Sequence, residues 1–164
     1  MGRTVTSSVS AFVATCAGLG YLPVRLTGRE RGAGGGTIGT LVGLALLPAL
    51  PSGPGRYAAF LLAAIAVSSL AAHKFCADTG THDDQRVIID ETVGYWVAVA
   101  WLPRDILTLA LAFGLFRAFD GLKPWPINVA DKKVGGGFGV VFDDVLAGAA
   151  ANLVLRAVYL IIPG

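Results

Sequence analysis

The chain has 164 residues, of which 54% are hydrophobic and 15% are charged, with a formal net charge of +2. A soluble domain usually carries about 25% charged residues, and one of this length cannot hide so much apolar surface, because many residues must form its exterior. The composition therefore favours a membrane protein. It excludes intrinsic disorder and disfavours a nucleic-acid-binding protein, and two cysteines, Cys16 and Cys76, make neither a disulfide framework nor a zinc site.

The first predicted element is an amphipathic helix over about residues 4–24, which would lie at the membrane surface rather than cross the bilayer. Its apolar residues recur at helical spacing among serines and threonines; they are Val5, Val9, Phe12, Val13 and Cys16. Stretches without charged residues then predict apolar helices over about 38–50, 57–73, 87–102, 105–119 and 140–162. Several are shorter than the roughly 20 residues of a straight span, so tilted, broken or half-inserted helices are expected among them.

These elements predict a single domain over residues 1–164 with an all-α fold, a small polytopic membrane helical bundle of four to five apolar helices. With five crossings and a cytoplasmic N-terminus, the loops over 74–86 and 120–139 would emerge on the cytoplasmic face. Most basic residues would then lie at that face, as the positive-inside rule expects; they are Arg3, Arg25, Arg29, Arg31, Lys74, Arg86, Arg117, Lys123, Lys132 and Lys133. Arg56 and Arg104 would lie at the opposite face. We therefore expect an integral, multi-pass protein of a bacterial-type inner or plasma membrane, in contact with membrane lipids; the pattern indicates no particular oligomeric state.

The acidic residues carry the clearest functional signal. All of the 11 except Glu30 fall between residues 78 and 144. Three groups adjoin apolar helices, namely Asp90-Glu91, Asp120 and Asp143-Asp144. Because an ionised side chain in a bilayer costs about 2.5–3.5 kcal/mol, two adjacent acidic pairs on separate apolar helices indicate a shared cation. Carboxylates without neighbouring histidine or cysteine ligands favour a hard cation, and Mg²⁺ is the expected one. Asp105, beside Arg104 in a turn, is expected to be an ordinary charge at a helix end.

A basic, glycine-rich stretch lies next to these acids, over about residues 117–139. The backbone amides of Gly135, Gly136, Gly137 and Gly139 are predicted to form a concavity that binds an anion, with positive charge from Arg117 and Lys123. That chemistry suits a phosphate group. The alternative is that these glycines only form a flexible loop.

Three motifs over about residues 83–150 together resemble the phosphatidylglycerophosphatase A family. They are Asp90-Glu91-x-x-Gly94, Arg117-x-x-Asp120-x-x-Lys123-Pro124-x-Pro126 and Gly136-Gly137-x-Gly139-x-x-x-Asp143-Asp144-x-x-Ala147-Gly148. The resemblance implies a small, Mg²⁺-dependent membrane enzyme that removes the terminal phosphate of phosphatidylglycerophosphate to give phosphatidylglycerol.

The resemblance also implies roles for single residues. The expected metal ligands are Asp83, Asp90, Glu91, Asp143 and Asp144, where Asp83 matches the family's upstream acid. The expected catalytic residues are Asp90, Glu91, Asp120, Lys123, Asp143 and Asp144, and the expected substrate-binding residues are Arg117, Lys123, Gly136, Gly137 and Gly139. Attack on phosphorus by water and attack by a carboxylate, with an aspartyl-phosphate intermediate, both remain open.

The N-terminal third departs from the family pattern. The family usually shows Leu-Pro followed closely by Ala-Pro-Gly-Thr-x-Gly-Ser, whereas this chain has Leu22-Pro23, about ten further residues, and then Gly-Gly-Gly-Thr-Ile-Gly-Thr over 34–40. Asp84 also replaces a usual proline. Neither change touches the carboxylate motifs, so activity is expected to be retained.

Two other functions use the same residues. Carboxylates on membrane helices also line ion or proton carriers, although the adjacent basic and glycine-rich anion site argues against a carrier. A headgroup transferase of the CDP-alcohol type is less favoured, because Arg117 and Ala147 stand where its motif requires aspartates.

Overall fold

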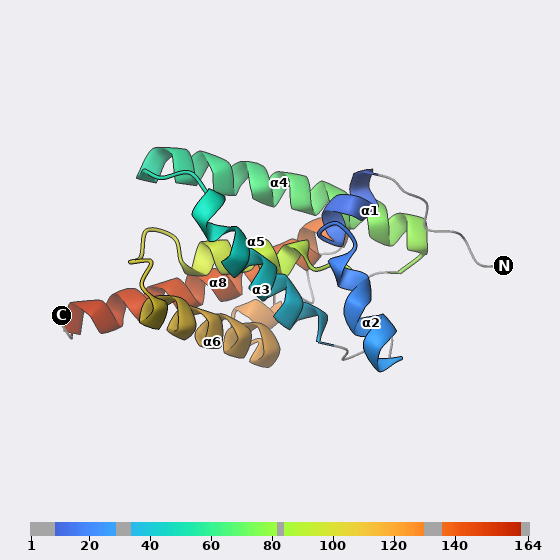
Figure 1. The fold of residues 1–164 in the computed structure, drawn as a ribbon. Coiled ribbons are helices and arrows are strands. Elements are labelled where there is room, and N and C mark those ends of the chain that lie inside the picture. Colours follow the sequence, from blue (N-terminus) through green and yellow to red (C-terminus); the bar gives the residue numbers. More distant parts are fainter. Residues whose placement is uncertain (1–8, 29–33, 82–83, 130–135, 162–164) are drawn as a thin grey trace.

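The computed structural model describes residues 9–28, 34–81, 84–129 and 136–161. Within these ranges the chain is helical and contains no strand, which confirms the all-α prediction. Its main elements are α1 (Val9–Ala14), the 3₁₀ helix η1 (Leu19–Tyr21), α2 (Leu22–Thr27), α3 (Gly35–Leu46), the 3₁₀ helix η2 (Leu47–Ala49), α4 (Pro54–Thr79), α5 (Ile89–Ala98), α6 (Ile106–Leu122) and α8 (Gly136–Ile161) (Figure 1).

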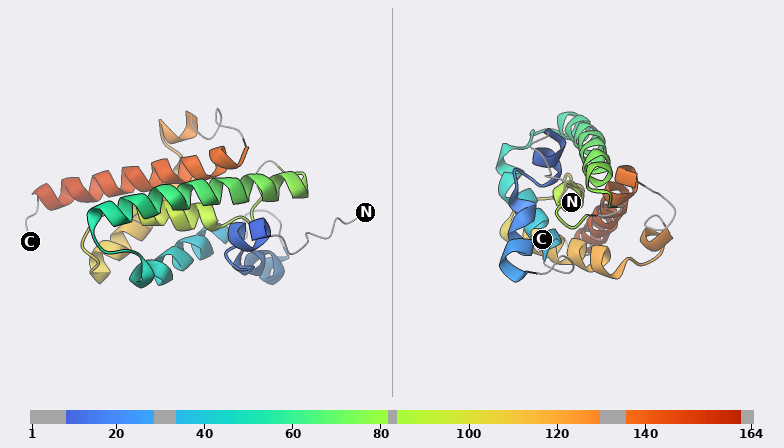
Figure 2. Two further views of the ribbon diagram at one scale, coloured as in Figure 1. Left: turned by 90° about the horizontal axis from the view of Figure 1, so that it is seen from above. Right: turned by 90° about the vertical axis from the view of Figure 1, so that its right-hand side faces the viewer.

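The short helix α5 is the centre of the bundle. The long helices α4 and α8 run antiparallel and alongside each other (Figure 2), and α3 and α6 cover the remaining sides of α5. Most side chains of α5 are buried, and those of Val93, Tyr95 and Ala98 are fully inaccessible to solvent. Because α5 is enclosed by protein on all sides, it fixes the positions of the helices around it.

Glycines let the helices approach α5 closely. A Cβ atom on Gly148 of α8 would lie 2.2 Å from the carbonyl oxygen of Gly94, and one on Gly94 would lie 2.8 Å from the Phe116 ring. On the α3 side, the carbonyl oxygens of Gly39 and Gly43 accept hydrogen bonds from Thr92 Oγ1 (2.8 Å) and Trp96 Nε1 (2.9 Å) of α5. Such small-residue contacts with polar side chains between helices are typical of helix packing in lipid.

The C-terminal end of α5 is capped from α8. Asn152 Nδ2 donates to the carbonyl oxygens of Ala98 and Ala100, at 2.9 Å each, and Arg156 Nη2 donates to Ala100 O at 3.1 Å. These bonds satisfy carbonyl groups that a helix end leaves without an intrahelical partner. The prediction of one helix over 87–102 is therefore too long, because α5 ends at Ala98 and the following residues form a turn.

The N-terminal segment also differs from its prediction. Instead of one amphipathic helix over 4–24, the described part contains α1, η1 and α2. The break lies at Cys16, Ala17 and Gly18, whose φ values of 46°, 58° and 89° are left-handed and end a right-handed helix. Within α1, Val9 and Phe12 are exposed whereas Ala11 and Ala14 are buried, so its exposed side carries apolar side chains.

Two helices are long and apolar enough to cross a membrane, judged by length and composition. They are Pro54–Thr79 and Phe138–Ile161, whose apolar 18-residue windows have mean hydropathies of 1.7 and 1.6. The stretch Gly35–Ala49 is apolar but shorter. The described structure thus contains two candidate spans, and the larger number of apolar crossings stays a prediction.

Candidate metal centre

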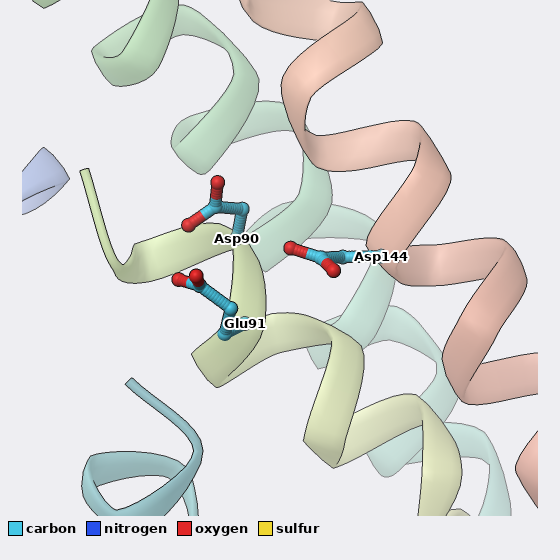
Figure 3. Close-up of side chains that lie close together, drawn as sticks. All are labelled: Asp90, Glu91 and Asp144. Carbon is cyan, nitrogen blue, oxygen red and sulfur yellow. The ribbon is translucent and has the colours of Figure 1, made fainter. Parts of the chain in front are cut away.

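Three acidic side chains from two helices converge beside the α5–α8 crossing. Asp90 and Glu91 lie in the first turn of α5, and Asp144 lies on α8 one turn before Gly148. One carboxylate oxygen from each lies within 4.8 Å of the other two, and Asp144 points from α8 toward α5 (Figure 3). The close approach of Gly94 and Gly148 positions this cluster, because it brings the α8 backbone against α5 one turn beyond the acids.

The burial of these acidic side chains favours a cation as their ligand. Asp90 is 6% and Asp144 is 4% exposed. Glu91 Oε2 and Asp144 Oδ1 are buried and accept no hydrogen bond from the described residues. A buried carboxylate oxygen without a donor is costly, whereas oxygen atoms are the ligands that Mg²⁺ and Ca²⁺ prefer. Two ligand oxygens on opposite sides of such an ion are about 4–5 Å apart. The cluster therefore fits a divalent cation.

Asp143 lies next to Asp144 on α8, and its carboxylate contacts a lysine. Its Oδ2 accepts a hydrogen bond from Lys123 Nζ at 2.6 Å, and Asp143 is only 7% exposed. Lys123 ends α6 with a left-handed φ of 43°, and its N–H donates to Phe119 O at 2.8 Å. This backbone turn directs a cationic side chain from α6 to α8, so Asp143 pairs with the predicted phosphate-binding lysine.

Arg117 and Asp120 form a second cation–carboxylate pair at the same end of α6. Both interact electrostatically with Glu91, and Asp120 also with Asp144. The described site thus gathers five carboxylates around two cationic side chains, Arg117 and Lys123. The excess negative charge is a second reason to expect a cation here, and the two basic groups suit a phosphate.

The first turn of α3 completes the site, and sequence reasoning missed it. A Cβ atom on Gly36 would lie 2.4 Å from Arg117 Nη1 and 2.7 Å from Glu91 Oε1, and one on Gly39 would lie 3.0 Å from Glu91 Oε2. Any side chain at Gly36 would therefore displace both functional groups. The sequence signals for this contact are the glycine run before Thr37, which is unspecific, and the match of Gly36 and Gly39 to the two glycines of the family pattern.

The glycine stretch predicted as an anion-binding loop has another conformation where it is described. Gly136, Gly137 and Gly139 belong to the first turns of α8, so they do not form a flexible loop. Helix N-termini also present backbone N–H groups to anions, and the predicted phosphate contact stays a prediction in this form. Gly135 and Asp83, the remaining predicted metal ligand, lie outside the described residues.

Asp84 is an anchor for the segment that leads into α5. Its carboxylate accepts hydrogen bonds from the Arg86 backbone N–H at 3.1 Å and from Arg86 Nε at 2.7 Å. Burial raises the pKa of Asp84, but the hydrogen bonds and charge of Arg86 outweigh it and hold the pKa below its ordinary value of 3.8. The Arg86 guanidinium also covers the rings of Tyr21 and Phe75, at 5.6 and 5.3 Å. The pair therefore ties η1 and α4 to the start of α5.

The fold and the site together define a helical protein of membrane-type composition, with a buried acidic centre for a cation and adjacent basic groups for a phosphate. A family model described as Phosphatidylglycerophosphatase A matches residues 12–159. The chain is 37% identical over 128 residues to phosphatidylglycerophosphatase A of Haemophilus influenzae, which covers 77% of each protein. It is 32% identical over 122 residues to phosphatidylglycerophosphatase A of Escherichia coli, which covers 73% of this chain and 71% of that one. The chain belongs to the phosphatidylglycerophosphatase A family, as its motifs predict.

A third relative is a putative phosphatidylinositol-3-phosphatase of Bacteroides thetaiotaomicron, 38% identical over 76 residues, which cover 44% of this chain and 47% of that protein. No solved structure is significantly similar to the chain.

Proposed function

We propose that this protein is a Mg²⁺-dependent lipid phosphatase that hydrolyses the terminal phosphate monoester of phosphatidylglycerophosphate to phosphatidylglycerol and inorganic phosphate. The observation that carries the proposal is the convergence of Asp90, Glu91 and Asp144 in a buried cluster next to two basic side chains. Family membership and the names of the relatives from Haemophilus influenzae and Escherichia coli support the choice of substrate.

The metal would be held by the carboxylates of Asp90, Glu91 and Asp144, with Asp83 and Asp143 as the further ligands that the sequence predicts. Mg²⁺ suits this donor set because it prefers carboxylate oxygens, together with water and phosphate. When bound, it neutralises charge on the phosphate oxygens and polarises the phosphorus centre.

The basic side chains would act directly on the phosphoryl group. Arg117 and Lys123 are each held by a carboxylate, Asp120 and Asp143, so their charges are oriented before substrate arrives. Fixed positive charge stabilises the transferring phosphoryl group without reorganisation during the reaction. The bond from phosphorus to the lipid oxygen breaks, an oxygen of water ends on phosphorus, and a proton from that water ends on the lipid alcohol.

We place the site at the cytoplasmic face of a multi-pass membrane protein. Trp101 (53% exposed) and Trp125 (80% exposed) flank α6 at its two ends, as interfacial tryptophans do. Between them, large apolar side chains face outward, as expected of a lipid-facing surface; on α4, α6 and α8 they include Leu62, Val67, Leu70, Ile106, Leu107, Leu111, Leu153 and Leu160. The positive-inside pattern sets the orientation.

Phosphate release by the detergent-solubilised protein tests this function. We expect release from phosphatidylglycerophosphate that requires Mg²⁺, stops with EDTA and exceeds release from phosphatidate or phosphatidylinositol 3-phosphate. Asp90→Asn, Glu91→Gln and Asp144→Asn should each lower turnover by about 10²-fold or more. Asp78→Asn is the matched control, because Asp78 is exposed and pairs only at the surface with Lys74 at 3.2 Å. Full activity in the site variants, or release that EDTA leaves unchanged, would contradict the proposal.

Phosphate release also distinguishes attack by water from attack by a carboxylate, and a phosphatase from an ion or proton carrier. Rapid acid quench followed by mild base would release phosphate from the protein if a carboxylate is the nucleophile, and none if water attacks directly. A pure ion or proton carrier would release no phosphate from any of the three lipids.

A further inference from the structure

An apolar groove lies between α3 and α6. Its volume is about 500 Å³, which is within the range of about 300–1,000 Å³ typical of small-molecule sites. The residues that line it are Leu41, Leu44, Arg104, Ile106, Leu109, Ala110 and Phe113. All of these side chains except Arg104 are hydrocarbon, so the groove offers almost no polar partner to a ligand.

The groove continues the metal centre along the same two helices. The wall on α3 starts at Leu41, about 1.4 turns after Gly36. An added Cβ atom on Gly36 would meet the side chains of Arg117 and Glu91. On α6, Phe113 precedes Arg117 by one turn, and Ile106 precedes it by about three turns. At 1.5 Å per residue, the wall on α6 thus extends from about 6 Å to about 16 Å from Arg117 along the helix axis.

The far end of the groove is formed by Arg104. Its Nη1 donates to Leu47 O at 2.9 Å, and its guanidinium lies over the Tyr57 ring at 5.8 Å. Because this charge already has protein partners, the groove does not need an anionic ligand there. A ligand that fits must be elongated, apolar along its length and polar only at the end next to the carboxylates.

We propose that this groove binds one acyl chain of the lipid substrate while its phosphate monoester lies at the metal centre. The inference rests on the proposed phosphatase function, and it adds the part of the protein that recognises the lipid tail. Continuity with the phosphate site favours a substrate chain over a peptide helix or a second copy of the protein, because neither supplies a phosphate at the Arg117 end. An acyl chain held in the groove predicts that the enzyme acts on a lipid phosphate in preference to a soluble phosphate ester.

Filling the groove tests the proposal. Ala110 is exposed and lines the groove, so Ala110→Trp should occupy it without disturbing the core. Leu111→Trp is the matched control, since Leu111 is 43% exposed on the same helix and does not line the groove. For long-chain phosphatidylglycerophosphate we expect Ala110→Trp to raise KM about tenfold or more, because several methylene groups lose their contacts. For the dihexanoyl form, KM should change less than twofold. Equal effects on both substrates, or no effect on either, would overturn the proposal.

A second measurement does not depend on turnover. Phosphatidate with a diazirine on one acyl chain, irradiated with the protein in micelles, should label peptides that contain Leu41 and Phe113. Ala110→Trp should remove that label, and Leu111→Trp should retain it. Uniform labelling of the outward faces of α4 and α8, with no excess at the groove, would refute the acyl-chain site. An inactive wild-type protein that still labels at the groove would contradict the phosphatase function and leave the lipid site standing.

Discussion

Replacing Gly148 by alanine tests how the helix crossing supports the metal centre. The new Cβ atom would lie 2.2 Å from Gly94 O and 3.1 Å from Val97 Cβ, whereas ordinary van der Waals contacts begin at 3.4 Å. The nearest atom is backbone, so α5 and α8 must separate by about 1 Å. Overpacking of this kind costs about 1–3 kcal/mol. A misplacement of about 1 Å at a reacting centre costs about 10²-fold in rate.

We therefore expect Gly148→Ala to lower phosphate release by about 10²-fold and to lower the midpoint of thermal unfolding in detergent by several degrees. The size of the loss follows from the position of the crossing, one turn from Asp144, because separation of the helices moves Asp144 away from Asp90 and Glu91. Raising the Mg²⁺ concentration should restore part of the activity, since a distorted centre binds the ion more weakly.

Gly114→Ala is the control for this substitution. A Cβ atom on Gly114 would meet nothing within 4 Å, and the residue lies within α6. Alanine favours a helix over glycine by up to about 1 kcal/mol, so stability should stay equal or rise, and turnover should be unchanged. If Gly148→Ala keeps wild-type turnover and unfolding midpoint, the crossing does not determine the geometry of the metal centre.

Three further predictions concern the residues around the centre. Lys123→Gln removes the cation that pairs with buried Asp143, so turnover should fall at least tenfold and stability by about 1–3 kcal/mol, with partial rescue by Lys123→Arg; an unchanged kcat would remove Lys123 from the site. Gly36→Ala should lower turnover with little change in unfolding midpoint, because the displaced Arg117 and Glu91 groups are flexible side-chain ends; a large stability loss with normal turnover would argue for a packing role instead. Because the pKa of Asp84 is lower in the folded protein than its ordinary value of 3.8, the stability it contributes is present above that value and lost as pH falls below it. Melts between pH 3 and 6 should therefore show a steeper acid-side decline for the wild type than for Asp84→Asn.

The presence of most helices could be predicted from the sequence, because charge-free stretches coincide with helices that are buried or carry outward-facing apolar side chains. The positions of the helix ends could not be predicted. The predicted helix over 57–73 is α4, which begins at Pro54 and continues to Thr79. Proline is favoured at the first helical position, and Gly80 ends the helix with a left-handed φ of 71°. Charged residues do not stop a helix, and Lys74 and Asp78 pair across one turn of it at 3.2 Å.

The acidic and basic residues of the candidate site could be named from the sequence, but the glycines that bring them together could not. Asp90, Glu91 and Asp144 can be recognised as candidate functional residues, because an ionised side chain on an apolar helix costs free energy and is usually kept for a function. Their pairing across two helices depends on Gly94 and Gly148, and a glycine in a sequence looks the same whether it ends a helix, forms a loop or permits a crossing. The spacing of the glycines at the start of α8 therefore could not show whether they belong to a helix or to a loop.

The C-terminal end of α5 could not be predicted from the sequence for a related reason. Its termination depends on Asn152, which lies on α8 more than fifty residues away and donates to Ala98 O and Ala100 O. No local signal around residues 98–102 indicates that these carbonyls find partners inside the protein. The opposite, N-terminal end of α5 lies at the candidate metal centre, where the positive end of the helix dipole favours the carboxylates of Asp90 and Glu91.

The structure also accounts for the chain's departure from the family pattern before α3. The family's Ala-Pro at the start of this motif is replaced by Gly34 and Gly35, whereas both later glycines of the motif, Gly36 and Gly39, are retained. The retained pair faces Arg117 and Glu91, where a Cβ atom has no room. Gly34 has a left-handed φ of 88° that alanine adopts poorly, and a Cβ atom on Gly35 would lie 2.8 Å from the carbonyl oxygen of Gln85. Both positions that face Arg117 and Glu91 therefore carry glycine, as the family pattern does, so the departure leaves the contacts between α3 and these two side chains in place.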